Sequence, residues 1–125
     1  MDKDRNEQKV RMRKRTKKYA SCVVRFFVSL PRSREEVRVL GGQLLRSRTS
    51  VAANYREASR ARSDAEFVSK VELCAQEAAE SMLWLELLEE DCGIRSDLLT
   101  WLLQESDELI AIFVTMAKNV KDRNK

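Results

Sequence analysis

The segment that decides the fold is residues 63–93, SDAEFVSKVELCAQEAAESMLWLELLEEDCG. Apolar and small residues recur in it at alternating spacings of four and three, which places them on one face of an α-helix. The positions on this seam are Phe67, Val71, Cys74, Ala78, Ser81, Leu85 and Leu88. Ser63 and Glu66 form a capping-box pattern at the start, and Gly93 is expected at the C′ position after the last turn. An apolar face of this length predicts partner helices that cover it.

Three further segments have the same helical periodicity. They span about residues 6–29, which end ahead of Pro31, about residues 33–60 and about residues 96–120. The connections are only a few residues long, so neighbouring helices must run antiparallel. The sequence therefore predicts an all-α fold, an antiparallel up-and-down four-helix bundle that forms a single domain over residues 1–125. The seams of these three helices are Met12, Tyr19, Val23, Phe26 and Leu30, then Val37, Leu40, Leu44, Ser47, Val51, Asn54 and Ala58, then Leu99, Leu102, Ser106, Leu109, Phe113, Met116 and Val120.

Local features refine the expected helix ends. Ser33 and Glu36 form a second capping box, which is expected to start the second helix. Gly41–Gly42 lies inside that helix and costs about 2 kcal/mol against two alanines. The pair is expected to mark a close helix crossing or a kink, with an unstable first turn as the alternative. The polar tail, residues 121–125, is expected to fray.

Composition excludes several classes of function. Histidine is absent from the 125 residues, so the chain lacks the usual general base and the usual zinc ligand. The three cysteines are widely spaced, without a CxxC pair, and are expected as free thiols: Cys22, Cys74 and Cys92. We therefore expect a protein that is not an enzyme and binds no cofactor or metal. No apolar stretch is long enough to span a membrane and no signal-peptide core is present, so we expect a cytoplasmic protein.

Charge is strongly segregated along the chain. Residues 1–34 hold 12 Lys and Arg against 3 Asp and Glu, whereas residues 63–93 hold 1 against 9. The net charge of +4 therefore combines a basic half with an acidic helix. The basic N-terminal segment, residues 1–18, contains the densest run of cations. These are the candidate nucleic-acid-binding residues Lys9, Arg11, Arg13, Lys14, Arg15, Lys17 and Lys18.

Two interpretations of this basic run remain open. Clustered cations attract phosphate backbones and release counterions on binding, which favours contact with RNA or DNA. No aromatic residue lies among the seven cations, so base stacking is not expected. Alternatively, the run pairs with the acidic helix of residues 63–93, either within the bundle or across a contact with another subunit.

A second cluster of polar residues lies on the two central helices. Glu77 and Glu80 are three residues apart and face the same side of one helix, while Arg46, Asn54 and Glu57 lie on the helix before it. A di-metal cluster would require histidines, which the chain lacks. We therefore expect these five residues to form a structural polar network that fixes the helix register.

The third and fourth helices are apolar on more than one stripe. The additional apolar residues are Trp84, Leu87, Leu98, Trp101, Ile110 and Ile112. One core cannot cover all of them, so part of this surface is expected to pack against another subunit. The alternative is that these side chains wrap the edges of the bundle.

Several motifs carry a family resemblance, which covers roughly residues 16–118. The more specific ones are QLLRS at 43–47, SVAANYREA at 50–58, RARS at 60–63, EF at 66–67 and Lys70. Weaker ones follow at EAAES 77–81, WLELL 84–88, ES 105–106, EL 108–109 and IF 112–113. Together they resemble the bacterial four-helix-bundle proteins, also called 23S rRNA-intervening-sequence proteins. Many of those proteins have glycine at the position of Ala58, and alanine suits a helix better.

The resemblance implies a four-helix bundle that assembles as a homopentamer. It extends to the accessory variability determinant proteins of diversity-generating retroelements, which look like basic pentamers that associate with a reverse transcriptase and with nucleic acid. The family has no established catalytic activity, and its name refers to the location of its genes. We therefore expect a non-catalytic, nucleic-acid-associated accessory protein. The alternative is a protein-interaction scaffold for a partner such as a reverse transcriptase, in which the charge segregation serves assembly.

Overall fold

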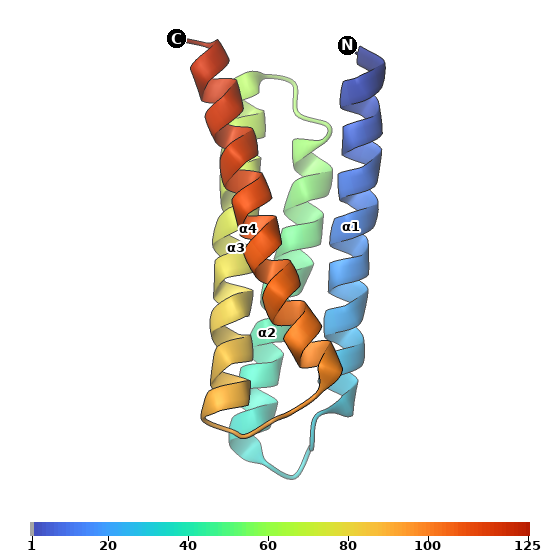
Figure 1. Ribbon diagram of the computed structural model, residues 1–125, viewed down its shortest axis with the longest axis vertical. Coiled ribbons are helices and arrows are strands. Elements are labelled where there is room, and N and C mark those ends of the chain that lie inside the picture. The colour runs from blue at the N-terminus through green and yellow to red at the C-terminus, as the bar shows by residue number, and fades with distance from the viewer. Residues whose placement is uncertain (1) are drawn as a thin grey trace.

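The computed structural model is an up-and-down bundle of four α-helices, and it describes residues 2–125 without the side chains of Asp2, Arg48 and Thr49. Consecutive helices are antiparallel and joined by short connections (Figure 1). The helices are α1 (Asp2–Ser29), α2 (Glu35–Ala58), α3 (Asp64–Glu90) and α4 (Asp97–Arg123). The predicted fold class is confirmed. None of the described helices combines the length and the apolar character that crossing a membrane requires.

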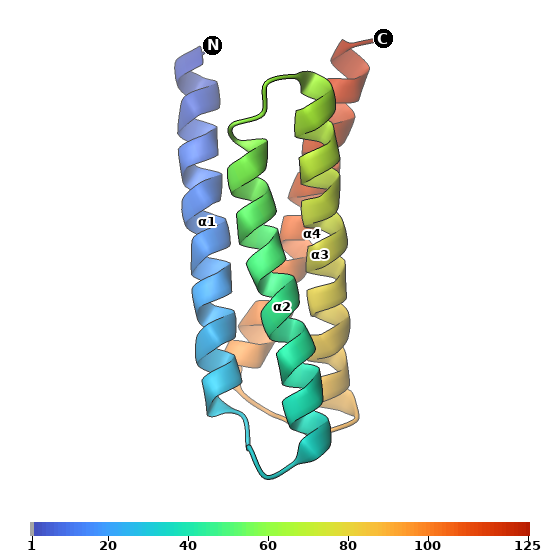
Figure 2. The same cartoon turned by 180° about the vertical axis from the view of Figure 1, so that it is seen from behind.

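The four helices occupy the corners of the bundle in chain order. α1 and α3 each pack against α2 and α4, whereas their backbones do not approach each other closely, so they lie on opposite corners (Figures 1 and 2). α4 starts beside the C-terminal end of α1 and moves towards α3 as it rises (Figure 1). This divergence separates the two chain termini at one end of the bundle. Among the described residues, no ion pair joins the basic helix α1 to the acidic helix α3.

The core consists of the predicted seam positions. All of them are buried except Leu40, Asn54, Phe67 and Met116, which are half-buried. The core also contains one buried polar pair between α1 and α4, because the Tyr19 hydroxyl lies 2.7 Å from the Ser106 hydroxyl. The seams predicted from residue spacing alone are thus confirmed as the interior of the bundle.

The additional apolar residues on α3 and α4 mostly cover the edges of this core. All six are half-buried, and five of them pack against the core: Trp84, Leu98, Trp101, Ile110 and Ile112. The sixth is Leu87. The structure therefore favours the edge-wrapping alternative for these five, and contact with another subunit stays a prediction.

Serine side chains cap the starts of α3 and α4, and of these only the cap at Ser63 was predicted. The Ser63 hydroxyl accepts a hydrogen bond from the Glu66 amide at 3.1 Å, and the Ser96 hydroxyl accepts one from the Leu99 amide at 3.0 Å. These contacts satisfy backbone donors that the first helical turn leaves open. The Glu66 carboxylate accepts from the amide of Arg62, one residue before the position that a capping box predicts.

The predicted capping box at Ser33 is wrong. α2 begins at Glu35, and Arg34 occupies the N-cap position with extended backbone and no side-chain cap. The Arg34 guanidinium donates to the Glu36 carboxylate at 2.9 Å and to the Cys92 carbonyl at 2.9 Å. Because Arg34 engages Glu36, this carboxylate does not reach back to Ser33.

Two other boundaries differ from the prediction. α1 begins at Asp2 rather than near residue 6, because acidic side chains in its first turns favour a helix N-terminus. The polar tail at 121–125 is predicted to fray, but α4 continues to Arg123. An ion pair of 2.9 Å between the Lys121 amine and the Glu72 carboxylate ties this last turn to α3.

The three glycines have different roles. A Cβ atom on Gly41 would lie 2.9 Å from the Leu30 Cδ1 atom, so Gly41 marks a close crossing between α2 and the end of α1. A Cβ on Gly42 would meet nothing within 4 Å. Gly93 has a φ of +70°, and it lies two residues beyond the C-cap Asp91 of α3, one further than the predicted C′ position.

Candidate nucleic-acid interface

Three of the seven candidate cations line a groove between α1 and α2. Arg13, Lys14 and Lys17 extend from α1, Arg56 comes from α2, and Arg60 comes from the connection that follows α2. The groove has a volume of about 410 Å³, and Val10 is the other residue that lines it. We call this feature the basic groove. Among the described residues, no acidic and no aromatic side chain lines it.

Sequence reasoning missed Arg56 and Arg60. Both are exposed; Arg56 lies in the last turn of α2, and Arg60 lies in the turn just after the helix ends. Because α2 runs antiparallel to α1, its end returns to the level of the basic run. The spacing of these two arginines, combined with the expected antiparallel pairing, is the signal that indicates their place.

The cations of the basic groove have no ion-pair partner within the described part of the chain. Like charges gathered at a low-dielectric wall raise the local positive potential and attract anions. Lys14, Lys17, Arg56 and Arg60 are exposed, while Arg13 is half-buried. The groove therefore presents its charge to solvent.

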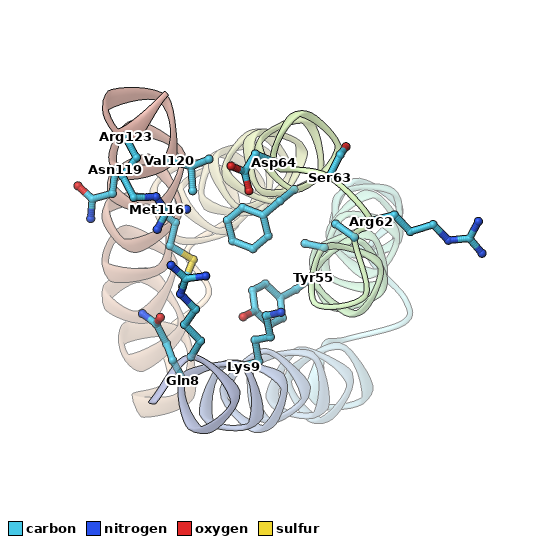
Figure 3. Close-up of a pocket in the computed structure, with 14 residues that line it drawn as sticks. Gln8, Lys9, Tyr55, Arg62, Ser63, Asp64, Met116, Asn119, Val120 and Arg123 are labelled. Atoms are coloured by element: carbon cyan, nitrogen blue, oxygen red, sulfur yellow. The ribbon is translucent and has the colours of Figure 1, made fainter. Parts of the chain in front are cut away.

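A second cavity lies at the end of the bundle where the termini diverge (Figure 3). All four helices and the α2–α3 connection contribute to it, and its volume is about 320 Å³. We call it the end pocket. Its aromatic lining residues are Tyr55 and Phe67, and Lys9 extends into it from α1. The Arg62 side chain borders the pocket but points away from it (Figure 3).

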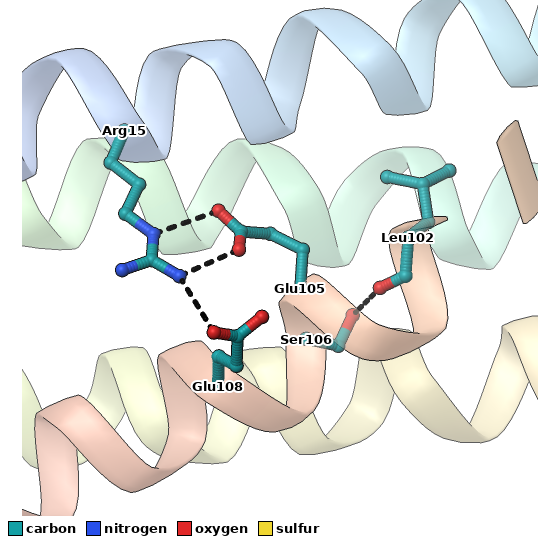
Figure 4. Close-up of polar contacts among 5 residues, drawn as sticks. All are labelled: Arg15, Leu102, Glu105, Ser106 and Glu108. Carbon is teal, nitrogen blue, oxygen red and sulfur yellow. Dashed lines mark hydrogen bonds and ion pairs between the residues drawn. The ribbon is translucent and has the colours of Figure 1, made fainter. Parts of the chain in front are cut away.

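Arg15 does not face the groove, because it is bound to α4 (Figure 4). Its guanidinium donates to both carboxylate oxygens of Glu105, at 2.9 and 2.7 Å, and lies 3.7 Å from Glu108. Glu105 is buried, at 7% exposure. The hydrogen bond to Glu105 raises the pKa of Arg15 further above its ordinary value. Arg15 is thus a structural cation that joins α1 to α4.

The other candidate cations are dispersed. Lys18 lies with its amine 5.4 Å from the centre of the Trp101 ring, a cation–π contact between α1 and α4. Lys9 belongs to the end pocket, and Arg11 is exposed. The predicted run therefore divides between a groove, a pocket and two helix–helix contacts, because a helix distributes consecutive residues around its axis.

The five-residue polar network does not form in the described structure. Arg46 is exposed and has no ion pair, whereas Glu57 binds the Lys70 amine at 2.9 Å and raises the pKa of Lys70. Arg46 and Glu57 are eleven residues apart on α2, about 16 Å at 1.5 Å per residue, so one side chain cannot bridge them. Burial, and secondarily the charge of Glu80, raise the pKa of the Glu77 carboxyl.

The sequence and the fold have known counterparts. The family model for the 23S rRNA-intervening sequence protein matches residues 8–115. The chain belongs to this family. A crystal structure of a protein of unknown function from the S23 ribosomal protein family of Bacteroides thetaiotaomicron is similar, with 30% sequence identity and a TM-score of 0.76. The similarity covers 85% of this chain and 97% of that one. No curated protein matches the sequence.

The family match contains the whole basic groove of this intervening-sequence family member but only part of its end pocket. The groove residues, Val10 to Arg60, lie inside residues 8–115. Five lining residues of the pocket lie outside: Arg5, Met116, Asn119, Val120 and Arg123. The groove therefore lies entirely within the matched region, whereas the pocket extends beyond it.

Thiol and metal chemistry has little support in the described residues. The cysteines Cys22, Cys74 and Cys92 are free and buried. Burial raises the pKa of Cys74 to about 12, and its thiol donates to the Val51 carbonyl at 3.6 Å. No group of three or more histidine, cysteine or acidic side chains is placed to hold a metal ion in the part that the structure describes.

Proposed function

We propose that this protein is a non-catalytic, nucleic-acid-associated factor that binds the phosphate backbone in the basic groove. The observation that carries the proposal is the gathering of five cations from α1, α2 and the connection after α2 in one groove, without an acidic lining residue among those described. The absence of histidine from the sequence supports the non-catalytic part. We place the protein in the cytoplasm, where nucleic acid is accessible to it.

The chemistry of the groove favours binding that does not depend on base sequence. Its cations can neutralise phosphates, and no described aromatic side chain offers a stacking surface there. On duplex DNA each neutralised phosphate contributes about −0.9 to the slope of log affinity against log salt concentration. Five contacts would give a slope of about −4.5, and four lost contacts would reduce it to about −0.9.

The test replaces Lys14, Lys17, Arg56 and Arg60 with glutamine. Arg15 stays in place because its loss would disturb the α1–α4 contact. The control variant replaces four exposed cations near the other end of the bundle and loses the same charge: Arg25, Arg32, Arg38 and Arg95. Fluorescence anisotropy with RNA and DNA, single- and double-stranded, at several salt concentrations gives affinity and slope.

We expect the groove variant to lose affinity for all sequences alike and to show the shallower slope, while the control retains most of both. Equal losses in the two variants would contradict the groove as the binding site, because only net charge would then matter. Absence of binding by the unmodified protein at low salt would overturn the proposal.

The second candidate function is a scaffold on which charge segregation directs assembly. The observation that favours it is the position of acidic α3, which α1 does not neutralise because the two lie on opposite corners. The family resemblance suggests one form of this scaffold, a homopentamer that binds a reverse transcriptase. Light scattering tests the assembly: a stable monomer at micromolar concentration contradicts it. Loss of an oligomer in the groove variant would favour the scaffold over nucleic-acid binding.

A further inference from the structure

The end pocket has a feature that the proposed function does not use, the hydroxyl of Tyr55. Tyr55 is buried, at 1% exposure, and its ring packs against Phe113 with 6.0 Å between the ring centres. Tyr55 belongs to the pocket lining, and its hydroxyl has no hydrogen-bond partner among the described residues. In contrast, the other buried tyrosine, Tyr19, is paired with Ser106. Buried polar groups in proteins are nearly always hydrogen-bonded, so this hydroxyl is available to bond a ligand that reaches it.

The lining around this hydroxyl combines flat apolar surface with positive charge. Tyr55 and Phe67 present aromatic rings, and the Met116 thioether adds a polarisable apolar surface. The charged and amide residues that line the pocket are Arg5, Gln8, Lys9, Arg62, Asp64, Asn119 and Arg123. Without Arg62, which points away, three of these are cations and one is acidic, so the pocket favours a ligand with a negative group.

These groups fit the parts of one kind of ligand. The rings and the thioether can pack against a planar base, the amides and the Asp64 carboxylate can hydrogen-bond its edge, and the cations can bind a phosphate. A volume of about 320 Å³ lies at the small end of the ~300–1,000 Å³ range of small-molecule sites. The pocket therefore admits one nucleotide and excludes a helical duplex.

We propose that the end pocket binds a single nucleotide, either a free mononucleotide or the phosphorylated end of a single strand. A fatty acid has a single carboxylate on an apolar chain, so it would leave the amides and the Tyr55 hydroxyl without hydrogen-bond partners. A nucleotide supplies acceptors for them. The site is separate from the basic groove, since Tyr55 and Lys9 line the pocket alone. Only the strand-end form rests on the proposed function.

The experiment measures binding of adenosine monophosphate to the full chain by calorimetry, with adenosine and inorganic phosphate as partial ligands. Tyr55→Phe removes the hydroxyl and keeps the ring. A second variant, Lys9→Gln with Arg123→Gln, removes two cations of the rim. The matched control, Arg25→Gln with Arg38→Gln, removes two exposed cations that do not line the pocket.

We expect the mononucleotide to bind at least tenfold more tightly than either partial ligand. Tyr55→Phe should weaken its binding about 3- to 10-fold, the loss of one hydrogen bond. The Lys9 and Arg123 variant should weaken it about tenfold, and the control should not change it. No binding at millimolar concentration, or affinity that Tyr55→Phe leaves unchanged, would overturn the proposal.

The source of the nucleotide is decided by competition. Displacement of the bound mononucleotide by a linear 5′-phosphorylated oligonucleotide, but not by the same oligonucleotide circularised, identifies a strand end. Displacement by neither identifies the free nucleotide. The groove variant defined above should bind the mononucleotide normally. Failure of the groove proposal and failure of the pocket proposal are therefore separate results.

Discussion

Removing Arg15 tests whether this cation holds the bundle together rather than binding a ligand. Arg15→Gln removes the cation that donates to both oxygens of the buried Glu105 carboxylate, and it leaves that carboxylate without a counter-charge. The side chains of the pair are 34% and 9% exposed, so the pair lies between a surface and a buried salt bridge. Exposed pairs are worth about 0–1 kcal/mol, and breaking a fully buried pair costs about 3–5 kcal/mol. We expect Arg15→Gln to lower the free energy of unfolding by about 2 kcal/mol.

Urea denaturation of Arg15→Gln, Glu105→Gln and the double variant forms a double-mutant cycle. Because the neutral amide that Glu105→Gln introduces needs no counter-charge, the double variant should be about 1 kcal/mol more stable than the sum of the single losses predicts. Arg11→Gln, on an exposed position of the same helix, serves as the control and should change stability by less than about 0.5 kcal/mol. A coupling energy near zero would refute the structural role of Arg15.

Three further perturbations follow from local geometry. Gly42→Ala should stabilise the bundle by about 1 kcal/mol. Gly41→Ala should stabilise it less, or destabilise it, because the new Cβ meets Leu30, and equal urea midpoints for the two variants would contradict this. Because the pKa of Glu77 is raised in the folded protein, its ionised form lowers the free energy of unfolding at neutral pH. The Glu77→Gln variant should therefore be slightly more stable than the unmodified protein at pH 7, and this difference should shrink as the pH falls towards 4. The thiol of Cys74 should react with iodoacetamide only on unfolding, so modification in the native protein at the rate of free cysteine would count against its burial.

The sequence predicted the interior of this fold well because heptad spacing and burial have the same physical cause. Positions such as Val71, Leu85 and Leu109 are apolar because they face the other helices, and they are fully buried. The serine cap at Ser63 could also be predicted, since a side-chain cap depends on residues within one turn.

The errors arose where a distant residue decides the local structure. Arg34 starts α2 because its guanidinium binds the Cys92 carbonyl, 58 residues away, and nothing near Ser33 reveals this contact. Arg15 likewise leaves the basic run because Glu105 lies 90 residues further along the chain. The end pocket requires residues from all four helices, so no local pattern indicates it.

The diagonal placement of α1 and α3 gives the bundle an electric dipole across its width. The N-terminal 34 residues have a net charge of +9, and residues 63–93 have a net charge of −8. A polyanion that approaches within about a Debye length, ~8 Å at physiological salt, exerts a torque that turns the α1 corner towards it. Molecules bound in this orientation direct their acidic helices outward. If the protein binds nucleic acid as proposed, a strand coated in this way would repel a second strand, and the charge pattern that attracts one polyanion would limit the complex to a single layer.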